Sequence, residues 1–508
     1  MLSNVNKQKY KIRNENVTIQ RNAMIQRNLI QRNILIEKDK KELVEKSIHC
    51  VIPLILHQFW HSNELPDSVK ESIENIKSNN PEFKHCLYNA TMSRDFIKEE
   101  FDSDVLYAYD SLIPYALKVD LWRYCILYKK GGIYLDSKYQ CIDGFKFIYL
   151  TDEEYLCRDL KESGYGIYNA LMICKPGNKL LLECINKIVK NTKEEYYGDS
   201  GLEISGPLMI KSFVPNSYDI KLFHTYSVYS AGSELLYYIC YKNFPILQIH
   251  PRYRKDQSKL GEHWYEFYNK KQIYVKKYEI LNYHQNKSML FQVYENCCIS
   301  ERIKNGFLWE EHMHILFEKY IQPDFISLEA GCHIGTHTLK LASLCSHVYA
   351  FEPFPESNRK LDYNLRTNHI KNVTLSNKGL SNCLETMKYG WTTEGNPGAS
   401  GLSNNPMGIP SGISVPDISV ELITMDSLGL EKLDFIKLDV EGYEELVIQG
   451  GVQTIQKCKP IITLESWSSH KGEIDIDSTK KRFHVLLEMG YQMLQVYGPD
   501  FIFLPPSI

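Results

Sequence analysis

Hydrophobic residues along the chain form short runs and helical stripes that alternate, and this alternation occurs in two separate stretches. In the first stretch, strands are predicted at residues 52–60 (IPLILHQFW) and 82–88, with a helix at 68–79 between them. In the second stretch, runs at 324–329 and 347–352 predict strands that flank a helix. Alternating strands and helices predict an α/β fold, with a mostly parallel sheet in the first stretch.

The segment 116–138 (ALKVDLWRYCILYKKGGIYLDSK) combines a helical stripe with a short strand. Its apolar residues first recur every three or four positions, which predicts an amphipathic helix. Asp120 and Arg123 are three residues apart and therefore share a face of that helix. Two glycines then end the helix, and residues 133–135 form a buried strand with Asp136 at its exit. This arrangement of charged residues predicts a functional site.

The chain has 508 residues, too many for a single hydrophobic core, so at least two domains are expected. Residues 1–47 are polar and are predicted to form a flexible or partly helical extension, with a small oligomerisation helix as the alternative. We expect a first domain at 48–272 and a second at 273–508. The sequence does not specify an oligomeric state.

Composition and charge limit the classes of partner and compartment. A formal net charge of −3 gives no electrostatic reason to expect nucleic acid or an anionic membrane. The 14 cysteines lack CxxC spacing, which favours a reducing compartment. The sequence contains no apolar run near the roughly 20 residues needed to span a bilayer, and its N-terminus lacks the apolar region of a signal peptide. A soluble, cytoplasmic protein is therefore expected.

An ordered series of motifs in the first stretch resembles the DXD-containing sugar-binding glycosyltransferases of family 32. The motifs are Ile52-Pro53, His57-Gln58-Phe59-Trp60, Leu65-Pro66, Asn80-Pro81 and the segment 116–138. The resemblance implies a GT-A type fold and retaining transfer of a sugar from a nucleotide-sugar donor to a glycan acceptor.

The same resemblance implies roles for individual residues. Asp120 and Arg123 would hold the donor sugar, and Asp136 would be the first aspartate of the metal motif. His263 lies in a segment that resembles the one reaching the diphosphate, and it is assigned with Asp136 to a divalent cation (Mn or Mg). Trp60 follows the first strand, where its ring could stack on a nucleotide base; a core tryptophan is the alternative.

The metal motif departs from the family pattern, because Asp-x-Asp is replaced by Asp136-Ser137-Lys138. Hard cations such as Mg²⁺ prefer carboxylate oxygens, and Lys138 supplies an ammonium instead. Three hypotheses remain open: a metal-dependent transferase that uses Asp136, a metal-free transferase in which Lys138 assists the phosphates, and a degenerate domain. The Asp120–Arg123 pair could also be a weak helix-surface ion pair.

In the second stretch, a glycine turn follows the strand at 324–329, and an acidic residue ends the next strand. Gly331 and Gly335 flank His333 in the turn, while Glu329 and Glu352 end the two strands. This is the nucleotide-binding pattern of a Rossmann-like unit. Two glycines suit a dinucleotide pyrophosphate poorly, and they suit S-adenosylmethionine better because it has no pyrophosphate.

Further motifs in this stretch resemble FkbM-type methyltransferases. They are Glu352-Pro353-Phe354-Pro355, 364–368 (NLRTN), 424–428 (TMDSL), 437–442 (KLDVEG) and 461–465. The resemblance implies a class I fold, S-adenosylmethionine as cofactor and methylation of sugar hydroxyls. By position, Glu329, Gly331, Gly335 and Glu352 would bind the cofactor, although Gly331-Cys332-His333 departs from the family's usual Gly-Ala-Asn.

The resemblance also implies that Asp439 and Glu441 face the transferred methyl group. An attacking hydroxyl must lose its proton, and Asp439, Glu441 and His333 are candidate bases, in that order. Capping of the following helix is the structural alternative for Asp439 and Glu441. The sequence thus predicts a bifunctional glycan-modifying enzyme. The alternative is an active sugar O-methyltransferase with a non-catalytic glycan- or nucleotide-binding N-terminal module, and a degenerate methyltransferase is a third possibility.

Overall fold

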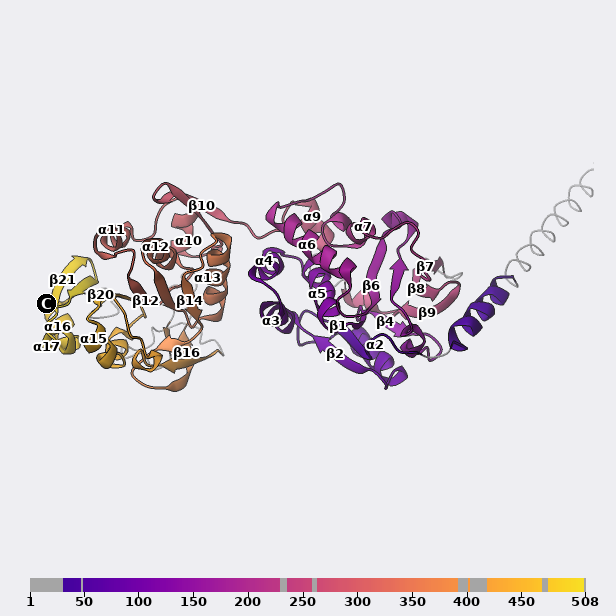
Figure 1. Cartoon of the computed structure of the whole chain (residues 1–508), viewed down its shortest axis with the longest axis horizontal. Coiled ribbons are helices and arrows are strands. Elements are labelled where there is room, and N and C mark those ends of the chain that lie inside the picture. The colour runs from indigo at the N-terminus through magenta and orange to yellow at the C-terminus, as the bar shows by residue number, and fades with distance from the viewer. Residues whose placement is uncertain are drawn as a thin grey trace, which may run out of the picture. The chain divides into compact units, whose positions relative to one another are not determined.

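The protein divides into two compact units, Met1–Val275 and Lys276–Ile508 (Figure 1). The computed structural model describes residues 31–46, 49–228, 235–257, 263–391, 401–402, 418–467 and 474–506. None of the helices within these ranges is long and apolar enough to cross a membrane. The two units are described separately.

In the described part of the first unit, nine strands form one sheet in the order β2-β1-β3-β6-β5-β7-β8-β9-β4. The strands are β1 (Ile55–Phe59), β2 (Lys84–Tyr88), β3 (Gly132–Leu135), β4 (Tyr139–Cys141), β5 (Tyr155–Arg158), β6 (Ile167–Cys174), β7 (Leu222–Val228), β8 (Leu235–Tyr241) and β9 (Phe244–Ile249). The helices are α2 (Asp67–Asn79), α3 (Ala90–Glu100), α4 (Ser103–Ser111), α5 (Tyr115–Lys130), α6 (Lys179–Lys193), α7 (Pro207–Lys211), α8 (Tyr253–Gln257) and α9 (Trp264–Asn269).

The prediction of a mostly parallel sheet is wrong for this unit. The first three strands in sheet order, β2, β1 and β3, run parallel as expected. Beyond them, β6 pairs antiparallel with both β3 and β5, and β7, β8, β9 and β4 pair antiparallel in turn. Only the pairing of β5 with β7 is parallel in this described part of the sheet. The segments that join β7 to β8 and β8 to β9 are too short to contain the crossover helix that parallel neighbours need.

Helix α5 and strand β3 form as the sequence predicts, and the two glycines between them have a steric role. Gly131 caps α5 at φ +64°, in the half of φ space that glycine tolerates. At Gly132, a Cβ atom would lie 2.4 Å from the carbonyl oxygen of Ile55. A side chain here would therefore separate β3 from β1, and Asp136 would lose its position at the edge of the sheet.

Residues 31–44 form a helix that packs on the rest of the first unit. Asp39 accepts hydrogen bonds from the backbone N–H and the side-chain amide of Asn243, at 3.0 and 2.8 Å. Glu42 accepts from Tyr241, and Leu43 is fully buried in the core. The described part of the predicted extension is therefore helical and bonded to the β8–β9 turn.

In the described part of the second unit, seven strands form a sheet in the order β14-β13-β12-β19-β20-β22-β21. They are β12 (Ile326–Ala330), β13 (His347–Phe351), β14 (Val373–Ser376), β19 (Phe435–Leu438), β20 (Ile461–Glu465), β21 (Gln492–Tyr497) and β22 (Asp500–Leu504). The first five in sheet order are parallel, and β22 is antiparallel to both of its neighbours. Strand order reverses at β12, the type of point at which α/β sheets bind ligands.

Smaller elements complete the second unit. The hairpin β10 (Tyr278–His284) and β11 (Lys287–Phe291) precedes the sheet, and β15 (Gly379–Leu380), β16 (Glu385–Trp391), β17 (Gly401–Leu402) and β18 (Ser419–Ile423) form a separate small sheet. The helices are α10 (Cys298–Lys304), α11 (Glu311–Tyr320), α12 (Thr336–Leu344), α13 (Pro355–Thr367), α14 (Glu444–Gln449), α15 (Val452–Cys458), α16 (Ile476–Arg482) and α17 (His484–Glu488).

Candidate active sites

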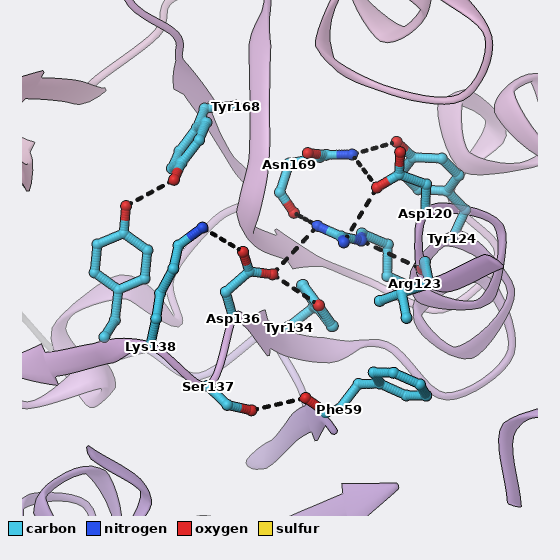
Figure 2. A network of polar contacts seen from close by, with 12 residues as sticks. Phe59, Asp120, Arg123, Tyr124, Tyr134, Asp136, Ser137, Lys138, Tyr168 and Asn169 are labelled. Atoms are coloured by element: carbon cyan, nitrogen blue, oxygen red, sulfur yellow. Dashed lines mark hydrogen bonds and ion pairs between the residues drawn. The ribbon is translucent and has the colours of Figure 1, made fainter. Parts of the chain in front are cut away.

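A buried polar network lies beside the end of β3 in the first unit, with Arg123 at its centre (Figure 2). The guanidinium donates to the carbonyl oxygen of Asn169 at 2.6 Å and forms ion pairs with Asp120 at 3.1 Å and Asp136 at 3.5 Å. Its carbon lies 4.4 Å from the ring centre of Tyr134, within the range of a cation–π contact. Arg123 is 6% exposed, so these groups replace water around its charge.

Asp120 lies behind Arg123 in this network and is held from three sides. Its carboxylate accepts from the Asn169 amide at 2.9 Å and from the Ser205 hydroxyl at 2.7 Å, in addition to its ion pair with Arg123. Burial raises the pKa of Asp120 to about 6, although Arg123 opposes the shift. Asp120 is not among the described residues that line the adjacent cavity, so it acts on that cavity through Arg123, whose guanidinium it orients.

Asp136 follows β3, and both of its carboxylate oxygens are engaged. The Tyr134 hydroxyl donates to one oxygen at 2.8 Å, and the Lys138 ammonium lies 2.8 Å from the other (Figure 2). Burial alone would raise the pKa of Asp136, but the charges of Lys138 and Arg123 lower it below its usual value. Burial would likewise lower the pKa of Lys138, and the Asp136 carboxylate instead raises it. Both groups are therefore charged at neutral pH.

A cavity of about 1070 Å³ opens beside this network, at the upper end of the range for small-molecule sites. It is lined by Phe59, Trp60, His61, Ile113, Pro114, Tyr115, Ala116, Val119, Arg123, Tyr134, Asp136, Ser137, Lys138, Tyr253, Arg254, His263, Trp264, Glu266 and Phe267. Trp60 is a core residue that also reaches the cavity, and stacking of its ring on a base stays a prediction. It is 9% exposed, packs on Val69 and Ile73, and still contributes to the cavity wall.

The residues present do not fit the divalent cation that the sequence predicted at Asp136 and His263. The Lys138 ammonium already pairs with one Asp136 oxygen, and the Tyr134 hydroxyl donates to the other. His263 is exposed, and its ring accepts a long contact, 3.4 Å, from the backbone N–H of Tyr265. Within the described ranges, no cluster of three or more His, Cys, Asp or Glu side chains has a geometry that could hold a metal ion.

In the second unit, two glycines after β12 allow close approach of the backbone. Gly331 adopts φ +80°, and a Cβ there would lie 1.6 Å from the carbonyl oxygen of Asp439. Gly335 adopts φ +92°, and a Cβ there would lie 2.3 Å from a methyl carbon of Leu361. Both positions therefore require glycine, and the turn forms one wall of a cavity at the switch point of the sheet.

Two buried carboxylates end the strands that flank this turn. Glu329 accepts from the Thr338 hydroxyl at 2.6 Å, while its other oxygen lies 3.8 Å from the Lys437 ammonium and accepts no hydrogen bond from the described residues. Glu352 accepts from the backbone N–H groups of His333 at 2.7 Å and Phe354 at 2.9 Å. Burial raises the pKa of both carboxyls, that of Glu352 to about 7.

Asp439 and Glu441 line the same cavity in different environments. Asp439 forms an ion pair with Lys437 at 3.0 Å. Glu441 lies at φ +50°, and burial raises its pKa to about 8, with Asp439 adding to the shift. The backbone N–H groups before α14 bond instead to Glu444, which accepts from Val440 and Gly442. The N-cap residue of α14 is Tyr443, and no side-chain capping hydrogen bond is formed there.

His333 also lines the cavity, and its ring lies 5.4 Å from the ring of Tyr294 in a parallel stack. Burial lowers the pKa of His333 to about 4, so the ring is neutral at pH 7. Its two ring nitrogens are buried without a hydrogen-bond partner among the described residues. Buried polar atoms of this kind normally have partners, and their position on a cavity wall suits a polar ligand.

Sequence reasoning missed Tyr134 and Tyr294, for which no local pattern gives a signal. It also passed over Lys437, whose position two residues before Asp439 on a strand places both side chains on one face. The loop around 395–412 that the sequence marks by its Gly, Ser, Asn and Pro content lies outside the described residues, apart from Gly401–Leu402.

Comparisons with known proteins agree with both resemblances. Residues 66–149 match the model of the glycosyltransferase sugar-binding region containing a DXD motif, and residues 329–493 match the methyltransferase FkbM domain. One segment of the chain is thus similar to each family. The FkbM match includes the glycine turn and the KLDVEG segment, and the glycosyltransferase match includes α5 and the Asp136 segment. Together the two families point to transferase activity.

Curated relatives named as glycosyltransferases match part of the chain. An uncharacterized glycosyltransferase of Acanthamoeba polyphaga mimivirus is 37% identical over 93 residues, 18% of this chain and 37% of the relative. Inositol phosphoceramide mannosyltransferase 3 of Schizosaccharomyces pombe is 31% identical over 140 residues, 27% of this chain and 38% of the relative. The chain thus spans well under half the length of these relatives.

Solved structures give weaker likenesses. The FkbM methyltransferase of Methylobacillus flagellatus KT aligns with a TM-score of 0.26 at 16% identity, covering 37% of this chain and 50% of that chain. The PaToxG glycosyltransferase also has a TM-score of 0.26 at 16% identity, covering 37% of this chain and 77% of that chain. Scores this low carry no argument about fold or function.

Proposed function

We propose that the first unit is a retaining glycosyltransferase of GT-A type that transfers a sugar from a nucleotide-sugar donor to a glycan acceptor. The observation that carries the proposal is the charged network of Asp120, Arg123 and Asp136 beside a cavity large enough for such a donor. Asp136 and Trp60 follow the parallel strands β3 and β1, at the edge where α/β sheets bind ligands.

In this proposal, Arg123 donates to hydroxyls of the donor sugar, and Asp120 fixes the direction of the guanidinium. Trp60 offers its ring to the nucleotide base, and His263, which also lines the cavity, reaches the diphosphate. Several relatives are named as mannosyltransferases, so a nucleotide-linked mannose is the first donor to test.

We further propose that the second unit uses S-adenosylmethionine to methylate a sugar hydroxyl. The residues fit this cofactor: Glu329 and His333 line the cavity and have buried polar atoms without hydrogen-bond partners among the described residues. Glu352 would accept from ribose hydroxyls and Glu329 from the amino group. When bound, the cofactor supplies an electrophilic methyl group.

Glu441 is the base that this geometry favours for the methyl transfer. Its pKa of about 8 lies near neutral pH, where a carboxylate can accept a proton and remain effective as a base. Asp439 is engaged by Lys437, and the neutral His333 ring has a low pKa, so both are less suited to the role. Glu441 would take the proton of the sugar hydroxyl while the hydroxyl oxygen attacks the methyl carbon.

The two activities together would make the chain a bifunctional glycan-modifying enzyme. The test is incubation of the full chain with nucleotide sugars, glycan acceptors and S-adenosylmethionine labelled in its methyl group. Sugar incorporation that is lost in Asp136→Asn and kept in Asp110→Asn would support the first activity, because Asp110 is a half-buried, ion-paired aspartate that does not line the cavity. Label on the glycan that is lost in Glu441→Gln and kept in Glu445→Gln would support the second. A glycan that never acquires label excludes the coupled function. A cytoplasmic location stays a prediction.

The alternative function makes the first unit a non-catalytic module that binds a glycan or nucleotide. The ion pair between Asp136 and Lys138 favours it, because the carboxylate is already neutralised. Release of free nucleotide from a nucleotide sugar, dependent on Asp136, would exclude this alternative.

A further inference from the structure

Lys138 occupies the position in the first unit where the family pattern has a second carboxylate. Its ammonium lies 2.8 Å from Asp136 and beside the rings of Tyr139 and Tyr168, at 5.6 and 5.7 Å from their centres. The hydroxyls of these two tyrosines bond to each other at 2.8 Å, which fixes both rings. Lys138 also lines the cavity, so its charge is held in place and faces a ligand.

We propose that Lys138 takes the place of the divalent cation, so that the first unit binds the diphosphate of its donor without a metal. The inference rests on the proposed glycosyltransferase function and adds the chemistry of its phosphate site. An ammonium has three N–H groups, and within the described ranges its ion pair is with Asp136, which leaves N–H groups for phosphate oxygens.

The charges along the cavity agree with an anionic ligand. Arg123, Lys138 and Arg254 face it with positive charge, against the carboxylates of Asp136 and Glu266. Asp136 is already paired with two of these cations. The lining side chains alone carry three positive and two negative charges, and Asp120 behind the wall pairs with Arg123, so the attraction for a diphosphate rests on the placement of Lys138 and Arg254 at the cavity surface.

The role of Lys138 in the transfer follows from where charge develops. The bond between the anomeric carbon of the sugar and the phosphate oxygen breaks, and its electron pair stays on that oxygen. The acceptor oxygen bonds to the anomeric carbon, and its proton passes to the departing phosphate. A fixed ammonium beside the phosphate stabilises this negative charge, as a metal ion would.

Calorimetry with UDP and GDP tests the proposal on the full chain, in buffer with Mn²⁺ and in buffer with EDTA. We expect one of the nucleotides to bind with the same affinity under both conditions. Lys138→Met should weaken this binding on the order of tenfold or more, the effect of losing a charge-assisted hydrogen bond. Lys221→Met is the matched control, because Lys221 is a similarly half-buried, ion-paired lysine of the same unit that does not line the cavity.

A gain of metal dependence gives a second test that a merely structural lysine would not pass. Lys138→Asp restores the Asp-x-Asp pattern, and its nucleotide affinity should be higher with Mn²⁺ than with EDTA. Binding by the unmodified chain that requires Mn²⁺ would overturn the metal-free site and leave the glycosyltransferase proposal intact. Absence of nucleotide binding under every condition would overturn both.

Discussion

Replacement of Asp120 by asparagine should separate the stability of the first unit from its activity. Asp120→Asn keeps the shape of the side chain and removes its charge. The amide oxygen can still accept from Asn169 and Arg123, and its NH₂ group can donate to the Ser205 hydroxyl, which can also act as an acceptor. The substitution therefore tests the charge of Asp120 with little change in its contacts.

The magnitude follows from the pKa of Asp120, which burial raises from 3.8 to about 6. A group whose pKa is raised on folding stabilises the folded state below the unfolded pKa, and that contribution is lost as the pH rises through the folded pKa. Each pKa unit corresponds to about 1.4 kcal/mol, so the ionised carboxylate costs the folded unit roughly 3 kcal/mol at neutral pH. The variant lacks this cost. The difference in free energy of unfolding between variant and parent should therefore grow in favour of the variant by roughly 2 to 3 kcal/mol as the pH rises from about 4 to about 7.5.

Hydrogen exchange of peptides from α5 and β3 measures this difference within the first unit, without requiring the whole chain to unfold in one step. Sugar transfer by the same variant should fall, because the Arg123 guanidinium loses the charge that orients it. A difference in stability that stays flat, or that shrinks as the pH rises, would contradict the assignment of Asp120 as a buried, strained charge. Stability that rises while activity falls is the pattern expected of a functional site.

Three further predictions concern other parts of the chain. Glu441→Gln should lower the rate of methyl transfer by about 10² to 10⁴-fold. A pH–rate profile of the parent should rise through about pH 8, and the profile of the variant should lack this rise. A variant profile identical to that of the parent would exclude Glu441 as the base. Gly331→Ala should abolish S-adenosylmethionine binding in calorimetry, because its Cβ would overlap the carbonyl oxygen of Asp439, and full binding would contradict the close approach. Asp39→Ala removes the two hydrogen bonds to Asn243 and should weaken the attachment of the helix at 31–44 by about 1 to 3 kcal/mol, so that proteolysis of this helix becomes faster. Cleavage at the parent's rate would argue against the docked helix.

Local patterns were sufficient for most individual elements and for the type of chemistry. Helix α5, strand β3 and the glycine turn at Gly331 follow from hydrophobic period and from glycine's access to positive φ, which depend on neighbours in the chain. The acidic residues at strand ends, Glu329 and Glu352, follow from the same kind of pattern. Such signals extend over a few residues, and that is why the sequence determined them.

Contacts between distant residues were decided by the tertiary structure. Asp120 bonds to Ser205, 85 residues away, and this places it behind Arg123 instead of in the cavity. The antiparallel part of the first sheet depends on which strands pair with one another beyond β3. The hydrophobic period of a strand does not specify which strand it pairs with. The sequence alone made Lys138 a departure from a metal motif. Folding places its ammonium 2.8 Å from Asp136, with Tyr134, Tyr139 and Tyr168 beside the two charges. The two side chains are only 21% and 22% exposed at the cavity wall, so their ion pair replaces most of the water around both charges.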